Sequence, residues 1–110
     1  KIHVIDSRQR MQLHLAAIFV SNFANLLFSV ADELLANNNM SMEWLHPLIM
    51  ETAEKAISAK PFEVQTGPAR RGDIQIIEKH LELLKENPEI AAIYKLLSQE
   101  ILRRYHPEIQ

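Results

Sequence analysis

Residues 13–31 read LHLAAIFVSNFANLLFSVA, nineteen consecutive residues without a formal charge. They belong to a helical pattern that is expected to begin near Ser7 and to end at the three asparagines of residues 37–39. At about 100° per residue, the polar side chains fall on one narrow stripe, and most of the remaining surface is apolar. The stripe contains His14, Ser21, Asn25, Ser29 and Asp32, with Asn22 at its edge. A helix this apolar must be covered on most sides, so the pattern predicts a long central helix and favours a second subunit.

The same stretch has the length that a bilayer-spanning helix requires. Its interior is unsuited to lipid, because His14, two serines and two asparagines fall within it and polar groups at that depth are costly. No cleavage site typical of a secretory signal is found either. The chain has no cysteine, which is typical of cytosolic proteins. We therefore expect a soluble, cytoplasmic protein with no membrane partner.

The composition narrows the possible functions. A chain of 110 residues is long enough for one domain with one core. Its formal net charge of -2 offers no long-range attraction for nucleic acid, so no nucleic-acid partner is expected. The five histidines lie on different expected elements and no thiolate is available, so no metal site is assigned.

The rest of the chain also predicts helices, and the fold class is therefore all-α. Ser41 is a candidate N-cap for a second helix, in which Pro47 either marks the regular start or kinks the first turns, and Glu51 pairs with Lys55. Asp73 and Asn87 are candidate caps of a third and a fourth helix, the last ending near Tyr105. The expected buried positions of these two helices are Ile74, Ile77, Leu81, Leu84, Ile90, Ile93, Tyr94, Leu97 and Ile101. In residues 1–5, apolar residues stand at alternating positions, as at the end of a strand.

Two parts of the sequence could carry chemistry. His14 lies near the start of the apolar stretch, where an imidazole could serve as general acid or base, although a hydrogen-bonded structural histidine explains it as well. Asn22 and Asn25 could orient a substrate carbonyl or carboxylate, or bond across a helix interface.

The second part is the loop of residues 66–73, TGPARRGD, which holds both glycines of the chain. Arg70 and Arg71 present forked donors suited to carboxylate or phosphate, and the third helix begins directly after them with its positive end facing the loop. This arrangement is typical of an anion site. The alternative is an exposed loop in which Asp73 or surface glutamates neutralise both arginines.

Several motifs, taken in order and with their spacing, resemble a known family. They are LHLAA at 13–17, SNFAN at 21–25, PLI with ETA between 47 and 53, TGPARRGD at 66–73 and HL at 80–81. This pattern resembles the helical C-terminal domain of unknown function that follows a Rossmann-like domain in bacterial NAD(P)-dependent oxidoreductases. That group is similar to pyrroline-5-carboxylate reductase, ketopantoate reductase and 6-phosphogluconate dehydrogenase.

The resemblance implies a bundle like the C-terminal domain of 6-phosphogluconate dehydrogenase, in which a long central helix packs with three shorter ones and two copies intertwine as a homodimer. Residues 1–110 would form this single helical domain, and a Rossmann domain would lie upstream. NADP or NAD would bind that upstream domain, and no cofactor is expected on this chain alone. The isolated domain is expected to be inactive.

By position, the resemblance implies that His14 and Asn25 are catalytic and that Ser21, Asn22, Thr66, Arg70, Arg71 and Asp73 contact a small-molecule substrate. Better-known relatives use a lysine on the corresponding long helix as the acid, whereas this helix has none, so that His14 would replace it. The function implied is a substrate-site and dimerisation domain for hydride transfer to or from a small carbonyl or imine compound. The alternative is a helical dimerisation or interaction module without a catalytic role.

Overall fold

The computed structural model describes residues 4–109, and the fold is all-α as predicted, with no strand in that range. The expected strand end at residues 1–5 lies mostly outside the described residues, and Val4 and Ile5 adopt no regular structure. The chain divides into two compact units, Lys1–Leu48 and Ile49–Gln110, which are described in turn. The prediction of a single domain over residues 1–110 stays a prediction.

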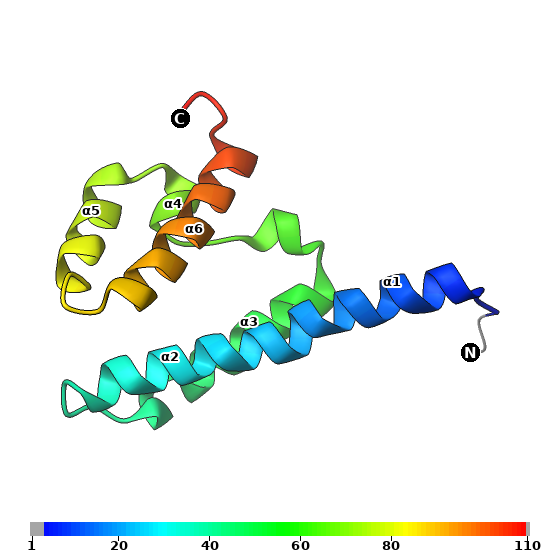
Figure 1. The fold of residues 1–110 in the computed structure, drawn as a ribbon, viewed down its shortest axis with the longest axis horizontal. Helices are drawn as coiled ribbons and strands as arrows, with labels where there is room; N and C mark the ends of the chain where they lie inside the picture. Colours follow the sequence, from blue (N-terminus) through cyan, green and yellow to red (C-terminus); the bar gives the residue numbers. More distant parts are fainter. Residues whose placement is uncertain (1–3, 110) are drawn as a thin grey trace. The chain divides into compact units, whose positions relative to one another are not determined.

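The first unit is dominated by one continuous helix, Ser7–Ala36, which runs from blue to cyan in Figure 1. It consists of α1 (Ser7–Ala17), the π-helical segment η1 (Ile18–Phe23) and α2 (Ala24–Ala36). Asp6 starts it with a capping box, in which its carboxylate accepts from the Gln9 amide at 2.7 Å while Gln9 accepts from the Asp6 amide at 3.0 Å. The predicted limits of this helix are confirmed, because it ends directly before Asn37.

The π-helical segment changes which side chains share a face. A turn closed by i to i+5 hydrogen bonds holds one residue more than a regular turn, so the residues beyond it are rotated by about 100° from their place on an uninterrupted helix. The constant period assumed for the polar stripe therefore does not hold. Asn25 lies beyond the segment, so helix geometry rotates it by about 100° from the place on the His14 line that a constant period gives it.

No residue of this long helix is buried within the chain. Val20 is 77% exposed, Leu13 62%, Phe19 60% and Leu26 52%, and Phe19 packs edge to face on Phe23 with 5.0 Å between ring centroids. The helix is long and apolar enough to cross a membrane by length and composition alone. The expectation that a second subunit covers this helix stays a prediction.

The start of the second predicted helix differs in detail from the prediction. Ser41 caps the 3-10 turn η2 (Met42–Leu45) by accepting from the Glu43 amide at 3.1 Å, and it does not cap the α-helix itself. The regular helix α3 (His46–Ser58) follows and contains Pro47 at its second residue, where no helical donor is needed. Of the two alternatives for Pro47, the structure has the regular start. The predicted pair of Glu51 and Lys55 is present at 3.0 Å.

The second unit contains η3 (Pro61–Val64), α4 (Pro68–Arg71), α5 (Ile74–Leu83) and α6 (Pro88–Tyr105), with α4 and α5 both in contact with α6 (Figure 1). The predicted caps are confirmed, because Asp73 accepts from the Ile76 amide at 3.2 Å and Asn87 accepts from the Ile90 amide at 3.3 Å. The predicted end at Tyr105 is confirmed as well.

The core of this unit is small. Ala69, Ile77 and Leu84 are buried with the hydroxyl-bearing Ser98, whereas Ile74 and Leu97, which were predicted to be buried, are 36% and 42% exposed. Both belong to amphipathic helices that have too few neighbours to cover their whole apolar width. Between α5 and α6, His80 Nδ1 lies 2.7 Å from the Tyr94 hydroxyl. Burial raises the pKa of Tyr94, and a hydrogen bond with Ser98 partly opposes that shift.

Candidate functional site

His14 lies in the last turn of α1 with its side chain exposed. Together with Ser7, Arg10 and Met11 it lines a shallow hollow of about 450 Å³ along one face of the helix. Within residues 4–109 its imidazole has no hydrogen-bond partner, so the structural alternative, a histidine fixed by a hydrogen bond, is not what this chain alone contains. A solvent-accessible imidazole on a preformed helix can exchange protons with a bound molecule.

The other polar side chains predicted on this helix lie in or directly after the π-helical segment. Ser21 and Asn22 are within η1, and Asn25 is the second residue of α2, and all three are exposed. Such segments are frequent at functional sites, because they place side chains and backbone groups where a regular helix does not. Nothing in the sequence marks this one, since the hydrogen-bond shift has no residue signature.

The predicted loop of residues 66–73 contains a helical turn, α4, that carries both arginines. Gly67 enters this turn with φ of 103° and Gly72 leaves it with φ of 71°, conformations in which a side chain is strained. Asp73 is committed to capping α5 and forms no ion pair with Arg70 or Arg71 among the described residues. The alternative in which Asp73 neutralises both arginines does not match this geometry. Thr66 precedes the turn and is exposed.

Arg70 is held by an aromatic stack that the sequence did not indicate. Its Cζ lies 4.4 Å from the ring centroid of Tyr105, whose ring also stacks on Phe62 at 4.3 Å and 11°. The Tyr105 hydroxyl donates to the Phe62 carbonyl, which closes the stack. A cation over an aromatic face contributes about 0.5 to 1 kcal/mol at exposed sites.

His106 was also missed by the sequence analysis, because 36 residues separate it from its partner. Its Nε2 lies 2.7 Å from the carbonyl oxygen of Arg70, and its Nδ1 lies 3.3 Å from a carboxylate oxygen of Glu108. A carbonyl only accepts, so Nε2 carries the hydrogen in this contact. The end of α6 therefore fixes both the backbone and the side chain of Arg70.

Arg71 differs from its neighbour. Its side chain is exposed, and within the described part of the chain its guanidinium makes no ion pair and no hydrogen bond. Its backbone amide closes the turn by donating to the Gly67 carbonyl at 3.2 Å. The backbone of Arg71 is thus held by the turn, and the N–H donors of its guanidinium are unpaired among the described residues. Such a group binds a carboxylate or a phosphate.

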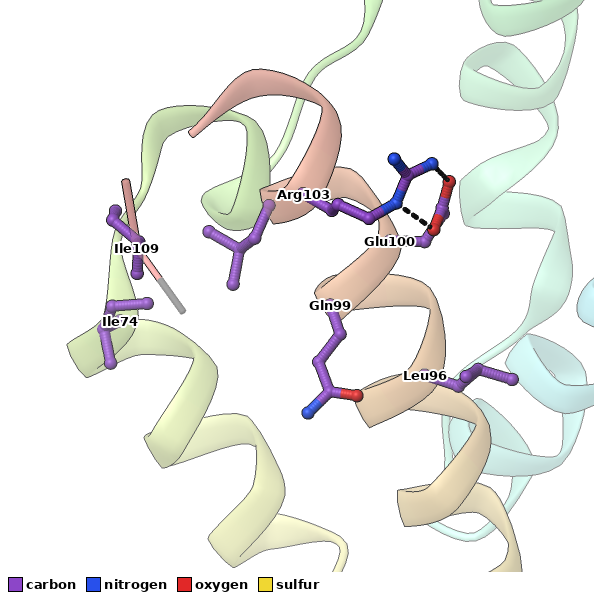
Figure 2. Close-up of a pocket in the computed structure, with 7 residues that line it drawn as sticks. Ile74, Leu96, Gln99, Glu100, Arg103 and Ile109 are labelled. Atoms are coloured by element: carbon purple, nitrogen blue, oxygen red, sulfur yellow. Dashed lines mark hydrogen bonds and ion pairs between the residues drawn. The ribbon is translucent and has the colours of Figure 1, made fainter. Parts of the chain in front are cut away.

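A hollow of about 620 Å³ lies on the same unit, beside α6 (Figure 2). Ile74 and Ile109 lie together at one side of it, and Gln99 extends from α6. Glu100, another lining residue, binds Arg103 and Arg104. Hydrogen bonds from Arg103 and then Arg104 lower the pKa of Glu100 to about 2, so its carboxylate stays ionised in mild acid.

The predicted site residues therefore fall into two groups. His14, Ser21, Asn22 and Asn25 belong to the first unit, and Thr66, Arg70, Arg71 and Asp73 belong to the second. The expectation that both groups act on one small-molecule substrate stays a prediction. Across residues 4–109, no three potential metal ligands gather in one place.

The glycines of the arginine turn provide a direct test of its geometry. A Cβ on Gly72 would meet Ile109 Cδ1 at 3.3 Å and His106 Cε1 at 3.4 Å, in addition to the strain of φ at 71°. We expect Gly72→Ala to lower the free energy of unfolding by about 1 to 3 kcal/mol in urea titrations followed by circular dichroism. Gln65→Ala, at a position with extended backbone directly before the loop, should change it by less than about 0.5 kcal/mol. Equal midpoints for the two variants would contradict the described turn.

The family follows from comparison with known proteins. The family model described as "Domain of unknown function (DUF2520)" matches residues 1–101. The chain belongs to the DUF2520 family. It is also similar to the crystal structure of a putative NADP oxidoreductase, BF3122, from Bacteroides fragilis, with 42% sequence identity and a TM-score of 0.88. The match covers 94% of this chain and 40% of that one, so this DUF2520 chain spans about two-fifths of the length of the solved protein. No curated protein matches it.

The predicted resemblance to the helical domain of such oxidoreductases is thereby confirmed. This DUF2520 chain is therefore an oxidoreductase-associated domain.

Proposed function

We propose that this DUF2520 chain is the substrate-site and dimerisation domain of an NAD(P)-dependent oxidoreductase. The reaction is hydride transfer between a nicotinamide cofactor and a small carbonyl or imine compound in the cytoplasm. The observation that carries this proposal is the 42% identity to an NADP oxidoreductase of which the chain spans only two-fifths. At that identity the helical part is shared, and the remaining length of the relative leaves room for a cofactor domain.

In this proposal, the nicotinamide cofactor binds a part of the protein outside this chain. A dinucleotide site of the Rossmann type needs a strand, a glycine-rich turn and a helix start, and residues 4–109 contain no strand. The turn between Gly67 and Gly72 leads into α4, which is only four residues long, and is not preceded by a strand. NADP or NAD would therefore bind an upstream Rossmann domain.

The residues of this chain would contact the substrate. His14 is accessible and has no described hydrogen-bond partner, which suits a general acid or base for the carbonyl or imine. Asn22 and Asn25 offer amides, with Ser21 beside them, at the π-helical segment. Thr66, Arg70, Arg71 and Asp73 would form the anion-recognition region, in which Arg71 has the only guanidinium of the two left without an aromatic or ionic partner in the described range.

Dimerisation is supported by the exposure of the long helix. None of its residues is buried within the chain, although its apolar side chains extend around most of its circumference. Membrane insertion would also cover them. The serines, asparagines and histidine inside the stretch oppose that explanation, because their polar groups would have to be desolvated in lipid.

A second candidate is an interaction module without a catalytic role. The exposure of the long helix favours it as well, since a helix whose only purpose is assembly would look the same. The two candidates differ in what they require of His14 and Arg71, which an interaction module would not need.

Cofactor binding tests the proposal that this chain holds the substrate residues and that a separate Rossmann domain holds the cofactor. We expect the 110-residue chain to bind neither NADPH nor NADH with a Kd below about 1 mM in titration calorimetry, because it lacks the pyrophosphate cradle. The same chain joined to its Rossmann domain should bind one of them in the micromolar range that is usual for enzyme ligands. Micromolar binding by the 110-residue chain alone would overturn the proposed division. Failure of the joined protein to bind either would favour the interaction module.

A further inference from the structure

The two arginines of α4 are neighbours in sequence and yet have different surroundings. The guanidinium of Arg70 lies over the Tyr105 ring, 4.4 Å from its centroid, and the Phe62 ring stacks on the same ring at 4.3 Å. Arg71 carries an exposed side chain without a partner among residues 4–109. Stacking on the ring holds the direction of the Arg70 guanidinium, so its in-plane N–H donors cannot turn toward a ligand as freely as those of Arg71 can.

The backbone of the same turn is held from the end of α6. His106 Nε2 donates to the Arg70 carbonyl at 2.7 Å, and the His106 ring and the Ile109 side chain lie against Gly72, close to where a Cβ would be. These contacts come from residues that follow the last helix, whereas the turn itself lies before α5. The position of the Arg71 Cα therefore depends on a side chain 35 residues later in the chain.

We infer that His106 is a positioning residue for substrate recognition, which fixes the turn through the Arg70 carbonyl so that Arg71 alone binds a substrate oxyanion. This inference rests on the proposed function of the arginine loop and assigns its parts. Arg70 is structural in this assignment, and a single guanidinium fork matches one carboxylate or one phosphate group. The substrate class is accordingly a small carbonyl or imine compound that carries one such oxyanion.

The test uses inorganic phosphate and acetate as probes, each titrated into the chain and followed by the ¹H–¹⁵N resonances of residues 66–76. We expect saturable shifts with wild type, and a loss of affinity of about tenfold or more in Arg71→Gln, since a charge-assisted hydrogen-bond pair is removed. Arg70→Gln should stay within about threefold of wild type. Preference between phosphate and acetate identifies which oxyanion the site takes.

The positioning role is tested with a matched pair at His106. His106→Leu removes the donor to the Arg70 carbonyl and is expected to weaken probe binding severalfold with Arg71 still present, whereas His106→Gln keeps an N–H donor and should restore most of the affinity. Thermal unfolding of each variant checks that it is folded. If His106→Leu does not fold, the comparison of Arg70→Gln with Arg71→Gln still decides the assignment of the two arginines.

The outcomes separate the inference from the proposed function. No saturable shift in wild type would remove the anion site itself, and with it this inference. Binding that survives Arg71→Gln but is lost in Arg70→Gln would overturn the assignment and leave the anion site in place. Equal affinities in His106→Leu, His106→Gln and wild type would overturn the positioning role alone.

Discussion

Substitution of Phe19 by lysine is expected to raise the dissociation constant of a homodimer by about 100-fold or more, because a buried aromatic anchor would be replaced by an unpaired charge. Phe19 is 60% exposed within the chain and forms an edge-to-face pair with Phe23 at 5.0 Å, so its removal opens no cavity inside one copy. Light scattering of the wild type at tens of micromolar should give the mass of a dimer, and that of Phe19→Lys the mass of a monomer.

Leu83→Lys is the matched control for this substitution. Leu83 is 81% exposed on α5, outside the long helix, and an added lysine there should leave the dimer intact. Circular dichroism would verify that both variants keep their helices. A wild type that is a stable monomer at tens of micromolar would contradict the proposed dimer, and partition of the wild type into lipid vesicles would favour the membrane explanation.

Replacement of His14 by glutamine should lower kcat by about 10² to 10⁴ when the chain is joined to the proposed Rossmann domain, the range that general acid or base catalysis contributes. The exposed imidazole has no hydrogen-bond partner among residues 4–109, so we expect the melting temperature to change little. The measurement is NADPH consumption against a panel of small ketones, aldehydes and imines, including members with a carboxylate.

Gln12→Ala provides the control for His14, since Gln12 is exposed on α1 and is not one of the residues lining the hollow at His14. Its turnover should match that of wild type. A His14→Gln variant with full turnover and a lower melting temperature would mean that the histidine is structural in the assembled protein, and the acid would have to be sought elsewhere.

The helices could be predicted because their signals are local. Asp73 and Asn87 cap helices within three residues of themselves, and the asparagine cluster ends the long helix where it was expected. The prediction of buried residues failed where burial depends on how many helices surround the side chain. Ile74 and Leu97 have the spacing of core residues, yet they are partly exposed because three short helices cannot cover every apolar position.

For the candidate site, the sequence predicts residue types but does not indicate the residues that support them. TGPARRGD contains the glycines and arginines that indicate an anion loop, and those are visible in eight residues of sequence. The different surroundings of Arg70 and Arg71 depend on Phe62, Tyr105 and His106, and 43 residues separate the hydrogen-bonded Phe62 and Tyr105. Contacts over such distances have no periodicity that a sequence could reveal.

The π-helical segment Ile18–Phe23 also affects how sequences of this family should be aligned. A helix absorbs one inserted residue as such a segment, and the flanking turns keep the orientation they would have in a helix one residue shorter. A relative that lacks one residue in this stretch would therefore present the same faces from α1 and α2 as this chain does. In such an alignment the gap belongs between Ile18 and Phe23, because a gap placed before His14 would pair His14 with the wrong residue, and a gap placed after Asn25 would do the same to Asn25.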